Sequence, residues 1–191
     1  MHIADGIIAA EIAVAADAAA VGALYFFSKR TASEEIPKMG IMAAALFVAS
    51  LIHFPLAGTS VHLGLFGLAG ILLGWRSVPV VFIALLFQSL LFQHGGLLSL
   101  GINVLNMSAG AAAAYIIWRM RPVPEIARAF LAGFAGIIIP ALLMAAEFEL
   151  SGYGRGIYYL MSVYAAVAAV EGILTVVIVG FFRKAEPELL T

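Results

Sequence analysis

Seven long apolar runs, separated by short polar or proline-containing breaks, occupy nearly the whole chain. Such runs predict membrane-spanning helices, because a bilayer core is crossed by about 20 consecutive apolar residues. The runs 39–53 and 62–74 are shorter, and we expect the turn 55–60 between them to help them reach one membrane surface. The seven runs are residues 7–27, 39–53, 62–74, 78–93, 97–118, 126–148 and 157–182.

The composition supports the same interpretation. Of the 191 residues, 64% are hydrophobic and 11% are charged, whereas about one quarter of a soluble domain is charged. We therefore predict an all-α, multi-pass protein of the cell inner (plasma) membrane, with residues 1–191 forming one transmembrane domain in the lipid bilayer. The net charge of −1 gives no support for nucleic-acid binding. Because the chain has no cysteine, disulfides and thiolate metal sites are excluded.

The distribution of lysine and arginine predicts an N-terminus outside and a C-terminus in the cytoplasm. With seven spans in this orientation, nine of the ten basic residues fall in cytoplasmic loops or the C-terminal tail. Only Arg155 falls outside. The nine residues are Lys29, Arg30, Lys38, Arg76, Arg119, Arg121, Arg128, Arg183 and Lys184.

Under this topology the four histidines, His2, His53, His62 and His94, all fall on or near the outer face. A single histidine near a membrane surface is more often a hydrogen-bonded interface residue than a metal ligand. Three interpretations stay open: structural hydrogen bonding in a membrane scaffold, a nitrogen-rich metal site, and haem ligation. A haem-binding membrane anchor for electron transfer would use His53, His62 or His94 as axial ligands, and needs two histidines facing each other across helices.

The start of the chain offers a specific chelating geometry. The α-amine of Met1, the amide nitrogen of His2 and Nδ1 of His2 can bind one metal ion, closing a five-membered and a six-membered ring. These nitrogens are forced into a plane, which leaves one position for a further nitrogen, and His62 is the best candidate. We expect Met1 to be retained, because processing enzymes seldom remove methionine before a bulky residue. Gly6 can turn the chain back among the helices.

A planar set of four nitrogens favours nickel, copper or low-spin cobalt over zinc, magnesium or calcium. Nickel is preferred here because a planar field suits a d⁸ ion, and cobalt is close behind. Copper would bind a bare site of this type at least as well, so its exclusion depends partly on metal availability. The amide must lose its proton, and binding should therefore strengthen as the pH rises.

Three segments have a distinctive sequence. They are Met-His-Ile-Ala-Asp-Gly at 1–6, His-Phe-Pro-Leu-Ala-Gly-Thr-Ser-Val-His-Leu-Gly at 53–64, and Leu-Phe-Gln-His-Gly-Gly-Leu at 91–97. Together they resemble the CbiM/NikM family, the cobalt and nickel substrate-binding subunits of energy-coupling factor transporters. The stretches 100–107 and 171–184 are similar too, so the resemblance spans both ends and the middle. The chain departs from the family at Ala4 and His53, and neither change removes a ligand.

The resemblance implies a substrate-capture subunit for divalent nickel or cobalt, with an extra first helix on a six-helix core and no organic cofactor. The implied ligands are the amine of Met1, the amide and Nδ1 of His2, and His62, so residues 1–6 form the metal-binding segment. It also implies partners: a membrane coupling subunit, two ATP-hydrolysing subunits and often a small accessory membrane protein. These partners would drive uptake.

Six further residues are expected to support the site. They are Asp5, His53, Ser60, His94, Asn103 and Asn106. Asn103 and Asn106 share a helical face and could orient the N-terminal segment or His62, although hydrogen bonding between helices explains them equally well. Asp5 could tie the N-terminal segment to the bundle, and His94 could line the entry path or steady its loop.

Motifs for enzymatic chemistry are missing from the sequence. The phosphate loop Gly-x-x-x-x-Gly-Lys-Ser/Thr is absent, so this chain cannot energise transport by itself. The patterns His-Glu-x-x-His and Gly-x-Ser-x-Gly and the dinucleotide fingerprint are absent as well. We therefore expect a transport subunit and not an enzyme.

Overall fold

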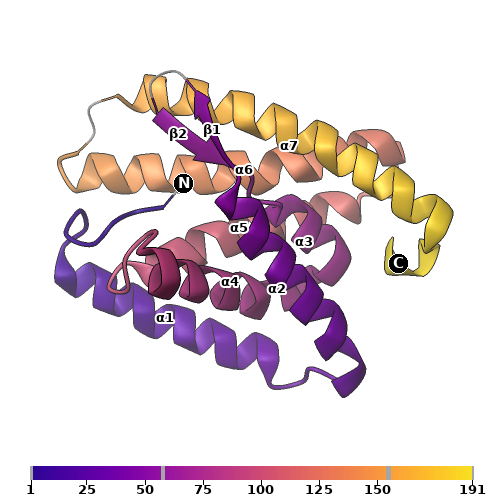
Figure 1. The fold of residues 1–191 in the computed structure, drawn as a ribbon, viewed down its shortest axis with the longest axis horizontal. Helices are drawn as coiled ribbons and strands as arrows, with labels where there is room; N and C mark the ends of the chain where they lie inside the picture. Colours follow the sequence, from indigo (N-terminus) through magenta and orange to yellow (C-terminus); the bar gives the residue numbers. More distant parts are fainter. Residues whose placement is uncertain (1, 57–58, 154–155, 191) are drawn as a thin grey trace.

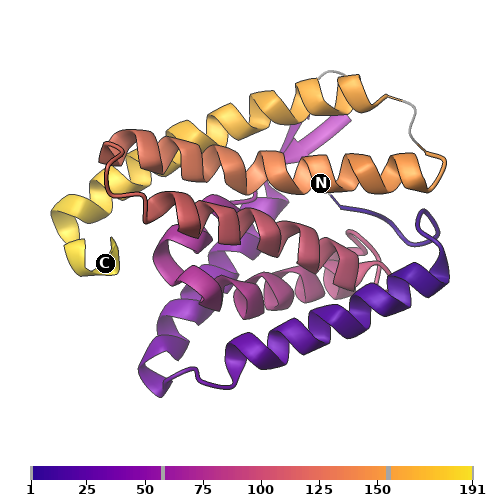
Figure 2. The same cartoon turned by 180° about the vertical axis from the view of Figure 1, so that it is seen from behind.

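The computed structural model describes residues 2–56, 59–153 and 156–190, with only the backbone described at positions 53, 55, 56, 59 and 60. This part of the chain is almost entirely helical, with one short antiparallel β-hairpin (Figures 1 and 2). The elements are α1 (Ala10–Ser28), η1 (Ser33–Glu35), α2 (Ile36–Leu51), β1 (His53–Leu56), β2 (Thr59–His62), α3 (Phe66–Leu73), η2 (Gly74–Arg76), α4 (Ser77–Phe92), α5 (Leu100–Trp118), α6 (Glu125–Leu150), α7 (Ile157–Ala185) and η3 (Pro187–Leu190).

The prediction of a helical membrane protein is confirmed. Among the described residues, five helical segments are long and apolar enough to cross a bilayer: α1, the run Phe66–Phe92 that joins α3 and α4, α5, α6 and α7. Helix α2 has 16 residues and α3 has 8, both shorter than an independent span requires. Seven spans therefore stay a prediction.

The β-hairpin occupies the place where the predicted spans 39–53 and 62–74 were expected to end and begin. Helix α2 ends at Leu51 and His62 belongs to strand β2, so these two boundaries were wrong. His53 pairs with His62 across the hairpin. Leu65 has a left-handed backbone with φ of 51°, and a left-handed residue stops α3 from extending back to His62.

Arg76 ties together three chain segments at one end of the bundle. It donates from Nη1 to the carbonyl oxygen of Phe27 at 2.7 Å and from Nη2 to that of Arg30 at 2.6 Å. Its Nε lies 3.3 Å from Oε1 of Glu35. The junction between α3 and α4 is thereby fixed beside the connection from α1 to α2.

The ends of α5, α6 and α7 meet at the same end of the molecule. Arg183 donates from Nε to Oε1 of Glu125 at 3.0 Å, which joins the last turn of α7 to the first turn of α6. Trp118, the last residue of α5, donates from Nε1 to the carbonyl oxygen of Leu190 at 3.2 Å. The loops predicted to be cytoplasmic and the C-terminal turn therefore gather on one side.

Helix α1 lies at the edge of the bundle and makes a polar contact with the start of α5 (Figure 1). Only Ala13 and Ala20 of its residues are buried. Asp17 accepts a hydrogen bond from the backbone N–H of Gly101 at 2.6 Å, at the start of α5. This contact satisfies an N–H that a helix start leaves without an intrahelical partner.

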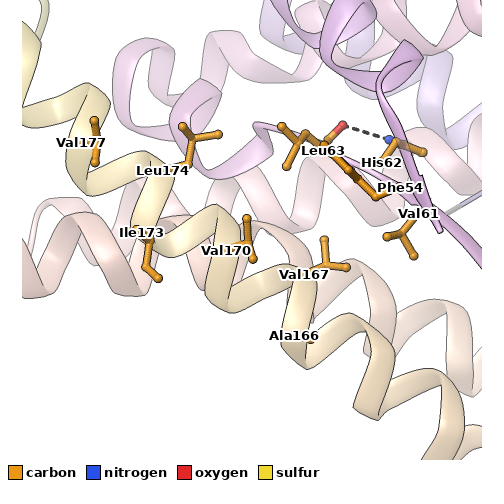
Figure 3. A pocket seen from close by; sticks show the side chains of 10 residues that line it. All are labelled: Phe54, Val61, His62, Leu63, Ala166, Val167, Val170, Ile173, Leu174 and Val177. Carbon is orange, nitrogen blue, oxygen red and sulfur yellow. Dashed lines mark hydrogen bonds between the residues drawn. The ribbon is translucent and has the colours of Figure 1, made fainter. Parts of the chain in front are cut away.

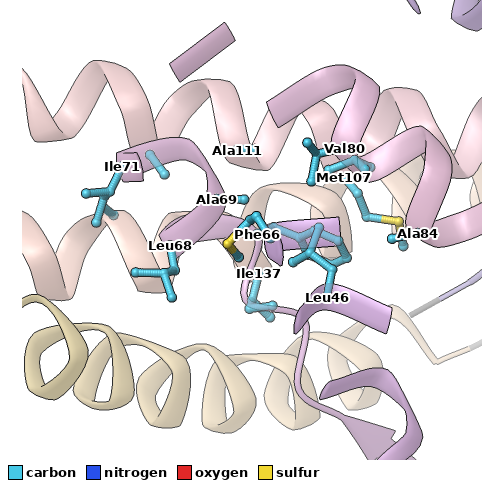
Figure 4. Close-up of a cluster of buried hydrophobic side chains, with 14 of the residues drawn as sticks. Leu46, Phe66, Leu68, Ala69, Ile71, Val80, Ala84, Met107, Ala111 and Ile137 are labelled. Atoms are coloured by element: carbon cyan, nitrogen blue, oxygen red, sulfur yellow. The ribbon is translucent and has the colours of Figure 1, made fainter. Parts of the chain in front are cut away.

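The core lies where α3 is packed between α5 and α6. Phe66, Ala69 and Ile71 of α3 belong to a buried apolar cluster with Met107 of α5 and Ile137 of α6 (Figure 4). Glycines bring these helices into backbone contact, as small residues do in membrane bundles. A methyl group at Gly67 would lie 2.5 Å from the carbonyl oxygen of Ala132, which is closer than van der Waals contact permits. The α3 backbone consequently rests directly on α6.

The substitution Gly67→Ala should lower the free energy of unfolding by about 1–3 kcal/mol, because a well-packed core has no room for the added methyl group. Thermal unfolding of the purified protein in detergent measures this change. Gly22→Ala is the matched control, since nothing lies within 4 Å of the added methyl group there. Equal unfolding temperatures for the two variants would contradict the packing described for α3 and α6.

Candidate metal centre

The N-terminal segment, residues 2–9, turns back into the bundle before α1 begins (Figure 2). Gly6 makes this turn with φ of 86°, a conformation in which glycine is favoured. Ile3 is 0% exposed and packs in a small apolar cluster with Ile8, Ile102 and Met144. Burial of Ile3 draws the neighbouring His2 towards the interior.

Asn103 of α5 clamps the N-terminal segment by two buried hydrogen bonds. Its Oδ1 accepts from the backbone N–H of Ile3 at 2.8 Å, and its Nδ2 donates to the carbonyl oxygen of Ile3 at 2.9 Å. The amide therefore satisfies both backbone groups of Ile3, next to His2. The structure thus places Asn103 where its predicted orienting role requires. Asn106 instead donates to Oε2 of Glu147 on α6 at 2.7 Å, which is a contact between helices.

Asp5 joins the N-terminal segment to the loop between α4 and α5. Its carboxylate accepts from the backbone N–H of Leu97 at 3.1 Å and from that of Ser99 at 2.8 Å. Gly96, with φ of 72°, lies so close to this carboxylate that a side chain there would collide with it. The same loop carries His94, so Asp5 positions His94 relative to His2.

His62 is 7% exposed and its protonation pattern follows from one neighbour. Its Nδ1 lies 2.9 Å from the carbonyl oxygen of Leu63 (Figure 3). A carbonyl oxygen only accepts, so Nδ1 carries the proton and Nε2 keeps its lone pair. An unprotonated imidazole nitrogen is the form that binds a metal ion.

Glu171 of α7 holds the backbone that follows His62. The carboxylate is 1% exposed and accepts from the N–H groups of Gly64 and Leu65, the latter at 3.1 Å from Oε1. An acidic residue within an apolar run does not reveal its partner in the sequence, and the structure supplies that partner here. Its role is to fix the segment Leu63–Leu65 and, through it, the position of His62.

His2, His62 and His94 meet although they come from three separate segments. One ligand atom from each lies within 4.8 Å of the others. Nε2 of His62 lies 3.4 Å from Nδ1 of His2. Imidazole nitrogens bound at about 2.0–2.1 Å from one ion lie at most about 4.2 Å apart. The His2–His62 pair is therefore within the span of a shared ion without movement.

His94 packs its ring against His2 edge to face, with the centroids 4.3 Å apart, and its ring centroid lies 5.2 Å from that of His62. Gly95 makes this close approach possible, because a Cβ there would lie 3.1 Å from Cδ2 of His2. These direct ring contacts leave no slot for a porphyrin between the described histidines. The arrangement therefore does not favour haem ligation.

Gln88 of α4 is a neighbour of His2 that the sequence did not single out for the site. Burial lowers the pKa of His2 well below its usual value, and the neighbouring rings of His62 and His94 lower it further. The Gln88 side chain acts in the other direction and raises this pKa. His2 is consequently neutral at pH 7. Nε2 of His2 and Oε1 of Gln88 are both buried and fall short of a hydrogen bond with described residues. Oε1 of Gln88 can accept a hydrogen bond from the Nε2–H of His2 when Nδ1 holds an ion.

Three predicted site residues cannot be placed in this arrangement. Met1, the expected amine donor, lies outside the described residues. The side chains of His53 and Ser60 lie outside them too, although the backbone of His53 pairs with that of His62.

An apolar cavity of about 590 Å³ lies beside His62, between the hairpin and α7 (Figure 3). Its walls include Phe54, Val167, Val170 and Leu174. Among its described lining residues His62 is the one with a ring nitrogen, so these residues offer no donor set for an ion and differ chemically from the histidine cluster.

The sequence matches the family described as "Cobalt uptake substrate-specific transmembrane region" over residues 2–189. A putative metal transport protein of Haemophilus influenzae is 33% identical, with 100% of this chain and 97% of the relative covered. A putative fused nickel transport protein of Archaeoglobus fulgidus is 32% identical, with 100% of this chain and 68% of the relative covered. A crystal structure of a truncated transition metal transporter is similar with a TM-score of 0.86 at 25% identity, with 97% of this chain and 99% of that one covered.

The substitution Asn103→Leu should release the N-terminal segment, because Ile3 would keep a buried N–H and a buried carbonyl without partners, each costing about 1–3 kcal/mol. Hydrogen exchange followed by mass spectrometry should show faster exchange in residues 2–9. Asn106→Leu is the control on the same helix, since Asn106 bonds to Glu147. Unchanged exchange in residues 2–9 of the Asn103 variant would show that other contacts hold the segment.

Proposed function

Because the chain belongs to the family of cobalt uptake substrate-specific transmembrane proteins, we propose that it captures one nickel or cobalt ion at the outer face for ATP-driven uptake by partner subunits. The family membership confirms the resemblance seen in the sequence and makes the chain a membrane component of cobalt or nickel transport. The ion is its transported substrate.

The observation that carries this proposal is the facing pair of ring nitrogens, Nδ1 of His2 and Nε2 of His62, 3.4 Å apart. In the ion-free chain, the Nδ1–H of His2 can donate to the lone pair on Nε2 of His62. An ion replaces that single proton between two neutral rings, so binding needs no rotation of either ring. Burial of the pair strengthens its electrostatic interaction with a dication.

The proposed ligands are the amine of Met1, the amide and Nδ1 of His2, and Nε2 of His62. Four nitrogens in a plane suit nickel best, with cobalt next. His94 closes the site by covering the face or edge of the His2 ring, and Asp5 and Asn103 hold the N-terminal segment in place. Loss of the amide proton makes the affinity rise with pH.

The proposed topology has seven spans in one domain, residues 1–191, with the N-terminus outside and the C-terminus in the cytoplasm of a cell inner membrane. It is supported by the gathering of basic loops at the end opposite the histidine cluster. Arg76 at that end contacts the Phe27–Arg30 connection, whereas Asp5 contacts the loop after α4 at the other.

The chain is proposed to act as a binding subunit without catalytic activity. Three histidines, His2, His62 and His94, lie together at one site, and the sequence has no phosphate loop. ATP hydrolysis is therefore assigned to two ATPase subunits, coupled through a membrane subunit and, in the full complex, a small accessory membrane protein. Residues 1–6 are the part that folds over the ion.

A chain with one extra residue before Met1 should lose nickel and cobalt binding, because the amine moves away while every side chain stays in place. Calorimetric titration of metal-free protein measures the affinity. The control is a chain with one extra residue after Thr191, which leaves the chelate intact. Equal affinities in the two chains would exclude the terminal amine as a ligand.

The substitution His62→Ala should weaken nickel binding by more than about a hundredfold, since even residues that only orient a ligand contribute about 10–100-fold. His53→Ala is the comparison variant and should weaken binding less, because the backbone of His53 pairs with that of His62 across the hairpin but His53 is expected only to support the site. The same titration measures both variants. If nickel affinity fell only in the His53 variant, the fourth nitrogen ligand would be assigned to His53, and the assignment to His62 would be overturned.

A further inference from the structure

A basic pocket of about 670 Å³ opens at the end of the bundle away from the histidine cluster. Its wall includes the ends of α5, α6 and α7, with η3 beside it (Figure 1). The polar and aromatic residues that line it, here called the arginine pocket, are Tyr115, Trp118, Arg119, Arg121, Arg128 and Arg183.

Positive charge in the arginine pocket exceeds what the described carboxylates neutralise. Glu125 pairs with Arg183 and lies 4.0 Å from Arg128. Arg119 and Arg121 form no ion pair with a described acidic residue. Among the described residues, Glu125 pairs with two of these four guanidinium groups and no carboxylate pairs with the other two, so the pocket is suited to an anion.

Aromatic rings and carbonyl groups hold two of these guanidinium groups in place. Arg128 lies over the Trp118 ring with its Cζ 4.8 Å from the centroid, and donates from Nη1 to the Trp118 carbonyl oxygen at 2.6 Å. Its Nε is buried and has no hydrogen-bond partner among described residues. Arg119 lies 5.5 Å from the Tyr115 centroid and donates to the Tyr115 hydroxyl at 2.7 Å. Preorganised donors of this kind fit the oxygens of a phosphate group.

We propose that the arginine pocket binds the phosphate headgroup of an anionic phospholipid. The pocket lies at the ends of membrane helices, at the level where tryptophan and tyrosine mark the boundary of the bilayer. Basic pockets between helices at such a boundary commonly bind acidic headgroups. The site and its ligand are separate from the metal centre and do not depend on the function proposed for it.

A neighbouring groove favours a lipid over a soluble phosphate. A cavity of about 460 Å³ lies along α6 and α7 and is lined by apolar side chains, among them Ile126, Phe130 and Val177. It begins at Pro124, the residue before Glu125, which pairs with Arg183 of the arginine pocket. An acyl chain can occupy this groove while its phosphate contacts the arginines, and a soluble anion would leave it empty.

The test is a titration of the full chain with lipid in neutral detergent, followed by native mass spectrometry. Phosphatidylglycerol and phosphatidylcholine with identical acyl chains are the probes. Phosphatidylglycerol should bind about tenfold more tightly or better, and the double variant Arg119→Gln/Arg121→Gln should lose most of that preference. The control is Lys29→Gln/Arg30→Gln, which removes two positive charges outside the pocket at the same end and should keep the preference.

Two further measurements distinguish a lipid from a soluble anion and guard against a variant that does not fold. Glycerol 3-phosphate should not displace phosphatidylglycerol at equal concentration. Displacement would show that the pocket binds a soluble anion and would overturn the proposal of a lipid. Arg121→Gln alone changes an exposed loop residue, and it should shift the preference in the same direction even if the double variant does not fold. An equal loss in the pocket and control variants, or no headgroup preference in the parent chain, would overturn the proposal as well.

Discussion

The N–H groups of the non-helical segments around the histidines find acceptors on side chains, and the N–H groups of Ile3 and Gly64 do so in buried positions. Helix side chains and one residue of the N-terminal segment supply them. Asn103 receives the N–H of Ile3, Asp5 receives two from the loop after α4, and Glu171 receives two from the segment after His62. Each unsatisfied group would cost about 1–3 kcal/mol in a protein interior and several in lipid. The position of every described histidine follows from these bonds.

The hydrogen bonds that satisfy these backbone groups therefore also determine where the candidate metal ligands lie. A buried carboxylate such as Glu171 is costly by itself, and its cost is offset only when the Gly64 and Leu65 amides point at it. The same bonds hold Leu63, whose carbonyl oxygen accepts from Nδ1 of His62. A chain of three contacts thus leads from a helix carboxylate to the lone pair on Nε2. The position of His62 in the candidate centre thus results from hydrogen bonds that satisfy backbone N–H groups.

Much of the architecture could be predicted from the sequence, because apolar runs longer than about 20 residues have few alternatives to membrane helices. The pairing of His2 with His62 could be proposed from chelate geometry and resemblance, and the structure brings the two rings together. The hairpin was not predicted, because its strands of four residues each continue the apolar runs on either side and show no pattern of their own. The contacts of Gln88 and Glu171 could not be predicted either. The sequence shows that a polar residue within an apolar run is costly to bury, but it does not show which residue will be its partner.

The backbone contact between Gly67 and Ala132 has a mechanical consequence. Helices separated by side chains can slide as rotamers change, but helices in backbone contact have no such freedom, and α3, α5 and α6 should behave as one stiff frame. Helix α1 shares this constraint at one point, because a methyl group at Gly101 of α5 would collide with the backbone nitrogen of Asp17. Helices α1, α3, α5 and α6 should therefore move together at these backbone contacts, and changes of shape should be concentrated in the segments that connect them.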